Sequence, residues 1–206
     1  MNGRVCFCFC FALTIEELKK DLDRPKDFVS NNFASSGKSI EEFWNMFHRQ
    51  IVKPYNTLKR QYKRYPEFHF MEKVKFEDYQ DALNCTEFET VILYSHCKDG
   101  GLESEKIEFY DRLVESGAVA AMIPFERSMD LDFSICEPIL LRTTLDSTPD
   151  KQFVTISWEE KVDLEMGLRL YYLIFEAIRR NPKLSYSRSF TEVLGSFHKI
   201  GNYAIQ

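Results

Sequence analysis

The chain has 206 residues, and its 27 Lys and Arg against 32 Asp and Glu give a net charge of −5 at pH 7. A net-acidic chain lacks the basic surface that sequence-independent nucleic-acid binding requires, so direct binding to nucleic acid is not expected. Hydrophobic residues make up 44% of the chain, with only 8 Gly and 7 Pro, which excludes disordered, collagen-like and linker-rich classes. We expect one domain over residues 1–206.

The first half of the chain alternates apolar runs with amphipathic stretches, as α/β proteins do. Val5–Leu13 is apolar on both faces and predicts a central strand, and a short helix is expected to follow Thr14. The polar stretch Asp27–Lys38 predicts a surface loop. A capping box at Ser39 begins a long helix, which Pro54 should kink or interrupt.

The second half continues the same alternation. Residues 103–115 fit either a hairpin or a helix, and 116–123 predict a short helix. A capping box at Ser157 predicts a long helix ending at Arg180, and a final helix is expected from Tyr186. The remaining predicted strands are Phe68–Phe76, Thr90–Ser95, Met129–Cys136 and Phe153–Ile156. Together these elements predict a mostly parallel sheet with helices on both faces.

Three of the six cysteines, Cys6, Cys8 and Cys10, alternate with phenylalanines in the first strand. They are expected to be small, reduced core residues, the alternative being metal ligands. The chain has no CxxC pair or Cys/His box, so no metal is expected, and the cysteine usage favours a reducing, cytoplasmic compartment. The apolar run is short for a secretory signal, and no stretch is long enough for a membrane span.

Two chemically active residues close two predicted strands: His96 follows Thr90–Ser95, and Cys136 ends Met129–Cys136. The forty residues between them leave room for the crossover that makes two strands parallel neighbours. Neighbouring strands lie about 4.8 Å apart, so the two side chains would meet at one sheet edge. A thiolate is a strong nucleophile and an imidazole can activate it. Gly100 and Gly101 would let backbone N–H groups approach an oxyanion.

The segment Val-Ile-Leu-Tyr-Ser-His96, with Met-Asp-Leu-Asp-Phe-Ser-Ile-Cys136 forty residues later, resembles the caspase-like cysteine peptidases, most closely the bacterial CHAT branch. In that family a hydrophobic strand ends in the catalytic His and the next long parallel strand ends in the nucleophilic Cys. The resemblance covers residues 90–140 well. It implies a caspase-like, Rossmann-like fold, a His96–Cys136 dyad, no cofactor, and cleavage of a protein partner in bacterial antiviral defence or regulated cell death.

The chain departs from the family pattern at both dyad positions. Cys97 follows the His where the family usually has Gly, and Glu137-Pro138 follow the Cys where a Gly is often found. Pro138 has no N–H to donate, and the charge of Glu137 would raise the pKa of a neighbouring thiol. The alternative to a peptidase is therefore a catalytically inactive domain of the same fold that binds a regulatory protein. A third hypothesis is an unrelated flavodoxin-like binding domain.

Other residues carry weaker hypotheses. Asp130, Asp132 and Ser134 share the Cys136 side of their strand, and Asp132 with Ser134 is a candidate substrate contact; structural pairing is the alternative. Cys97 is expected in the core. A basic cluster in the second helix would bind an acidic partner or RNA, or simply complement the helix dipole. Its members are Lys53, Lys59, Arg60, Lys63 and Arg64.

Overall fold

The computed structural model describes residues 4–23, 27–98, 105–135, 138–158, 164–196 and 203–205. Within these ranges the main sheet has six strands in the order β2-β1-β3-β7-β8-β9, and a small sheet has the order β4-β5-β6. The strands are β1 (Arg4–Phe9), β2 (Phe68–Glu72), β3 (Phe88–Tyr94), β4 (Cys97–Lys98), β5 (Lys106–Glu108), β6 (Leu113–Glu115), β7 (Asp130–Ser134), β8 (Val154–Trp158) and β9 (Tyr203–Ile205).

Strands β2, β1, β3, β7 and β8 are parallel, and β9 pairs antiparallel with β8. The chain places β2 on one side of β1 and then returns to place β3 on the other. That reversal makes the sheet doubly wound, and folds of this kind bind ligands outside the carboxyl ends of the strands at the reversal. The predicted α/β class with a mostly parallel sheet is confirmed.

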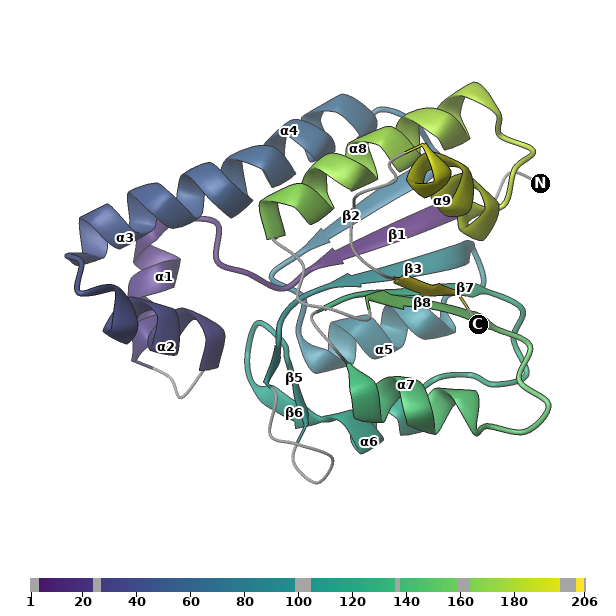
Figure 1. The fold of residues 1–206 in the computed structure, drawn as a ribbon, viewed down its shortest axis with the longest axis horizontal. Coiled ribbons are helices and arrows are strands. Elements are labelled where there is room, and N and C mark those ends of the chain that lie inside the picture. Colours follow the sequence, from purple (N-terminus) through teal and green to yellow (C-terminus); the bar gives the residue numbers. More distant parts are fainter. Residues whose placement is uncertain are drawn as a thin grey trace.

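Helices cover both faces of the main sheet (Figure 1). One face carries α4, α8 and α9, and the other carries α5, α6 and α7, while α1 and α2 pack against α3 to one side of the sheet. The helices are α1 (Ile15–Leu22), α2 (Asp27–Ser36), α3 (Ile40–Phe47), the π-helix η1 (His48–Val52), α4 (Lys53–Tyr62), α5 (Phe76–Asn84), α6 (Ser116–Ala121), α7 (Ile139–Asp146), α8 (Leu164–Arg180) and α9 (Tyr186–Gly195). None of those within the described ranges is both long and apolar enough to cross a bilayer.

Strand β1 separates two hydrophobic cores. Phe7 and Phe9 point toward α4 and α8, where the ring of Phe9 stacks on Tyr55 with centroids 3.9 Å apart. Cys6, Cys8 and Cys10 point toward α5 and are at most 2% exposed. The predicted burial of these three cysteines is confirmed. The Cys6 and Cys8 sulfurs lie 3.8 Å apart, closer than the strand rise alone suggests, because the side chains lean together.

The loop predicted over Asp27–Lys38 is wrong, because this segment contains helix α2. Val29 and Phe33 lie four residues apart and therefore share one helix face. Val29 is buried, and the ring of Phe33 meets Phe43 edge-on at 5.4 Å. Gly37 has φ +62°, the left-handed conformation that commonly ends helices. Tertiary packing of two apolar side chains overrides the polar composition here.

The prediction that a long helix begins at Ser157 is also wrong. Ser157 belongs to β8, where it pairs with Phe133 on one side and Ala204 on the other. Helix α8 spans Leu164–Arg180, so the predicted end at Arg180 is confirmed. Strand pairing on both sides outweighs the local capping signal.

Two other expectations are confirmed. Ser39 accepts the Glu42 N–H at 3.2 Å while Glu42 accepts the Ser39 N–H at 2.9 Å, which is a capping box. The long helix that follows is interrupted just before Pro54, where five residues form η1.

The ambiguous stretch 103–115 contains the hairpin of β5 and β6, and helix α5 lies where no helix was predicted.

Candidate functional site

The candidate site lies where β3 and β7 end. These strands are parallel neighbours, with Tyr94 level with Ser134, and the Ser95 N–H donates to the Ser134 carbonyl at 3.3 Å. His96 is the second residue after Tyr94, and Cys136 is the second residue after Ser134 in the sequence. The prediction that these two strands are adjacent and parallel is confirmed. Both chain segments leave the sheet at the same edge.

His96 is held by its backbone between the two sheets. The Glu108 N–H donates to the His96 carbonyl at 2.9 Å, and Cys97 in β4 pairs with Ile107 in β5. The imidazole is half-buried, whereas Cys97 is 5% exposed and packs in the core on the α5 side. This burial confirms that Cys97 is a core residue.

Several predicted site residues lie outside the described residues. Cys136 is one, and so are Gly100 and Gly101, the expected neighbours of the oxyanion. The His96–Cys136 dyad and its oxyanion donors therefore remain predictions. Glu137 also lies outside, while Pro138 is described and stands at the N-cap of α7.

A buried carboxylate, Glu105, connects the segments on either side of this site. Its two oxygens accept the N–H groups of Leu140 and Leu141, both at 2.9 Å, and the Ser116 hydroxyl at 2.5 Å. Glu105 is 4% exposed. A carboxylate at a helix N-terminus satisfies N–H groups that the helix leaves without partners. Glu105 therefore fixes the start of α7, just after position 136, against the hairpin that follows His96.

The sequence gives no local signal for this role of Glu105. Its two backbone partners lie 35 and 36 residues away, in a helix whose position depends on the whole sheet. A single Glu in a stretch that fits two secondary structures cannot be distinguished from a surface residue by spacing alone.

Asp132, a predicted substrate contact, is fully buried beneath α8 and α9. Its Oδ2 accepts the hydroxyl of Tyr171 at 2.9 Å and also that of Tyr186. Oδ1 is buried and has no hydrogen-bond partner among the residues that the structure describes. Burial raises the pKa of Asp132 to about 7, even though the hydroxyls of Tyr186 and Tyr171 act to lower it. The carboxyl group is thus engaged inside the protein in this structure.

Ser134, the other predicted contact, is 5% exposed. Gly167 of α8 packs against it and against Tyr94: a Cβ on Gly167 would lie 3.7 Å from the Tyr94 ring and 3.9 Å from Ser134 Oγ. The beginning of α8 therefore lies close over the ends of β3 and β7. Asp130, the first residue of β7, accepts the Ser187 N–H at 3.0 Å.

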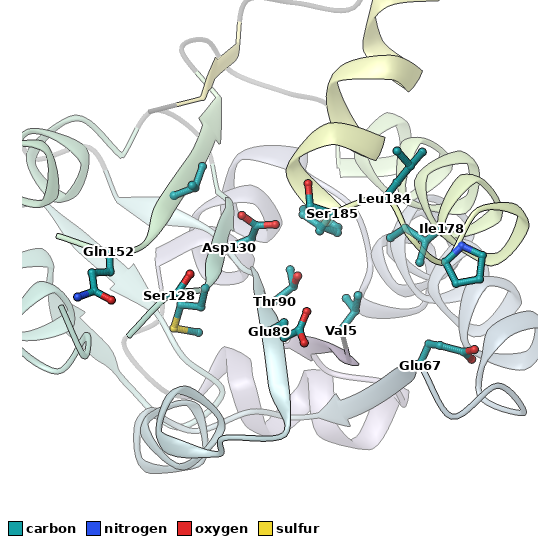
Figure 2. A pocket seen from close by; sticks show the side chains of 14 residues that line it. Val5, Glu67, Glu89, Thr90, Ser128, Asp130, Gln152, Ile178, Leu184 and Ser185 are labelled. Carbon is teal, nitrogen blue, oxygen red and sulfur yellow. The ribbon is translucent and has the colours of Figure 1, made fainter. Parts of the chain in front are cut away.

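A cavity of about 430 Å³ lies at the opposite, amino-terminal edge of the sheet (Figure 2). Its charged lining residues are the acids Glu67, Glu89 and Asp130. Tyr186 lines it as well and also donates to Asp132. The cavity is therefore separated from His96 by the length of the strands.

The described cysteines have the character of core residues. Cys6, Cys8, Cys10, Cys85 and Cys97 are all thiols, and all but Cys85 are buried. The hydrogen bond with Cys6, together with burial, raises the pKa of Cys8, which makes it a poor nucleophile. Across the described ranges, no three His, Cys, Asp or Glu side chains are grouped so that they could hold a metal ion.

A scan against protein-family models and a search of curated proteins find no match to this chain. Its function must therefore be inferred from its own residues and their geometry.

Replacing Glu105 by Ala should lower the free energy of unfolding by about 2–4 kcal/mol, because two helix N–H groups and a buried hydroxyl lose their acceptor. Glu105→Gln, which keeps one oxygen, should lose less. Glu115→Ala is the matched control: Glu115 is exposed and pairs with Lys106 at the surface, so its loss should cost below about 1 kcal/mol. Guanidinium unfolding measures all three, and equal losses for Glu105→Ala and Glu115→Ala would refute the role of Glu105.

Asp132 should make stability depend on pH. Its folded pKa of about 7 exceeds the unfolded value near 4, so between these pH values the folded state binds more protons. The contribution of Asp132 to the free energy of unfolding is therefore fully present below about pH 4. It falls by up to roughly 4 kcal/mol as the pH rises to about 7. Asp132→Asn should flatten this slope in urea unfolding measured from pH 4.5 to 7.5, with the exposed Asp23→Asn as the control for net charge. An unchanged slope in Asp132→Asn would contradict the assignment.

Proposed function

We propose that the protein is a caspase-like cysteine endopeptidase in which Cys136 is the nucleophile and His96 its acid–base partner. The observation that carries this proposal is the parallel pairing of β3 and β7 with Tyr94 level with Ser134. Positions 96 and 136 each follow two residues later, so the register supports a short separation between them. The carboxyl ends of β1 and β3 flank the reversal of this doubly wound sheet, where such folds bind ligands, and β7 lies next to β3 on the side away from β1.

The chemistry follows that of thiol peptidases. The proton of the Cys136 thiol moves to His96, and the sulfur attacks the scissile carbonyl carbon. As the C–N bond breaks, the imidazolium of His96 gives its proton to the leaving amine, and a thioester remains. Water, losing a proton to His96, then hydrolyses the thioester and restores the thiol. Backbone N–H groups of Cys136 and the Gly100-Gly101 segment would hold the oxyanion.

The burial of other cysteines supports Cys136 as the nucleophile. Cys97, directly beside His96 in the sequence, is 5% exposed and packs in the core on the α5 side. Cys6, Cys8 and Cys10 are buried under α5. A nucleophile must reach its substrate, and none of these four thiols meets that condition. Cys85 is partly exposed, but it follows α5 just before β3 begins, at the end of that strand opposite His96.

The competing proposal is an inactive caspase-like domain that binds a regulatory protein. Pro138, which begins α7 two residues after Cys136, has no N–H to give an oxyanion. The Glu137 charge and the replacement of Gly by Cys97 after His96 favour the same alternative. On either proposal the partner is a protein, the compartment is the reducing cytoplasm, and the role is in bacterial defence or regulated cell death.

Cys136→Ala should abolish covalent labelling by peptides that carry a thiol-reactive acyloxymethyl ketone, and should lower cleavage of a fluorogenic peptide panel by thousands-fold or more. His96→Ala should also be severely impaired. Cys97→Ala should retain most activity, because it removes only a core side chain. Mass spectrometry of the labelled protein identifies the modified cysteine. Loss of labelling in Cys97→Ala would mean that the nucleophile is misassigned, and an unlabelled, inactive wild type would favour the binding domain.

A further inference from the structure

A groove lies on the helical face opposite α5, between α8 on one side and η1 with α4 on the other. Its volume is about 520 Å³. Figure 1 shows α4 and α8 running side by side over this face of the sheet. The groove is lined by Arg49, Lys53, Pro54, Thr57, Leu58, Glu165, Leu168, Arg169 and Tyr172.

The lining residues form two helical stripes. Arg49, Lys53 and Thr57 recur every four residues along η1 and α4, and Glu165, Leu168 and Tyr172 recur every three or four along α8. The stripes make the groove elongated along the helix axes. The π-helix η1 supplies Arg49, and π-turns inside α-helices occur frequently at functional sites.

The wall of the groove formed by η1 and α4 is basic, although the chain is acidic overall. Arg169 pairs with Glu165 at 2.6 Å, which leaves its own wall near neutral. Arg49 and Lys53 are exposed, and neither forms a salt bridge with another described residue. Lys59, from the basic cluster predicted on this helix, pairs instead with Glu72 at 2.6 Å. Arg49 and Lys53, which have no acidic partner in the described part of the chain, both line the groove.

The floor of the groove is apolar. Leu58 and Leu168 line its base but are only 1% and 2% exposed, so they close the floor as part of the core and offer little accessible surface of their own. Tyr172 is 38% exposed, and its ring is held edge-on against Tyr62 with centroids 5.5 Å apart. An aromatic ring held in place at the rim of an apolar groove can contact a partner without losing much conformational entropy.

We propose that this groove binds an acidic amphipathic helix of a protein partner, whose apolar face rests on Leu58, Leu168 and Tyr172. The acidic side chains of the partner would pair with Arg49 and Lys53. An amphipathic helix laid along two parallel helices is a common mode of peptide recognition, with anchors spaced three and four residues apart. RNA fits less well, because the floor is apolar and the chain carries a net charge of −5.

The test uses a fluorescein-labelled synthetic helix of about 18 residues, or five turns, with Leu on one face and Glu on the flanks. A twin with Gln in place of every Glu tests the charge, and a single-stranded RNA tests the other occupant. Fluorescence anisotropy is measured with the full chain carrying Cys136→Ala, so that binding is separated from any cleavage. Failure here would thus leave the peptidase proposal untouched.

The double variant Arg49→Glu/Lys53→Glu should weaken binding of the acidic helix about tenfold or more. The matched control, Arg60→Glu/Lys63→Glu, makes the same charge change on α4 and the residue after it, outside the groove, and should change affinity less than about twofold. Circular dichroism checks that both variants fold. The Gln twin should bind more weakly than the Glu helix, and added salt should weaken the Glu helix most.

Three results would overturn the proposal. One is no binding of the acidic helix at millimolar concentration, and another is an equal loss of binding in both double variants. The third is tighter binding of RNA than of the acidic helix, lost only in Arg49→Glu/Lys53→Glu. Self-association of the chain that this variant abolishes would instead assign the groove to a second copy of the chain.

Discussion

Strand β1 is buried on both faces, and the other elements take their places around it. Its phenylalanines pack on Tyr55 and the helices of one face, and its cysteines pack on the opposite face. A strand covered on both faces and paired in parallel on both edges must lie inside the sheet. Because β2 and β3 pair with opposite edges of β1, the strand order reverses there.

The parallel pairing of β3 with β7 determines which segments meet at the carboxyl ends of these strands. The segments after Tyr94 and Ser134 leave the sheet side by side. Glu105 then ties the hairpin after His96 to the start of α7, and α8 packs above the strand ends with Gly167 facing Tyr94 and Ser134. The backbone frame of the candidate site is thus fixed from three directions, by a neighbouring strand, a buried carboxylate and a helix. A preorganised frame is what covalent catalysis requires of its supporting residues.

Much of this frame could be predicted from the sequence, since periodicity and capping signals report local structure. The central strand, the Ser39 capping box and the adjacency of the β3 and β7 segments were all accessible in that way. The predictions were wrong where contacts between distant residues determine the secondary structure. Phe43 packs on Phe33 and stabilises a helix in a polar segment, and pairing with Phe133 keeps Ser157 in a strand. Glu105 and the tyrosines that hold Asp132 could not be found, because their partners are far away in sequence.

The proposed peptidase requires that the fold bring the imidazole of His96 and the thiol of Cys136 together. A crystal structure of the protein would give the distance from the nearer imidazole nitrogen of His96 to Cys136 Sγ. Adjacent parallel strands lie about 4.8 Å apart, so we expect a separation within about 7 Å. A Cys136 side chain turned into the core under α7, or a sulfur far beyond that distance with the imidazole facing away, would contradict it.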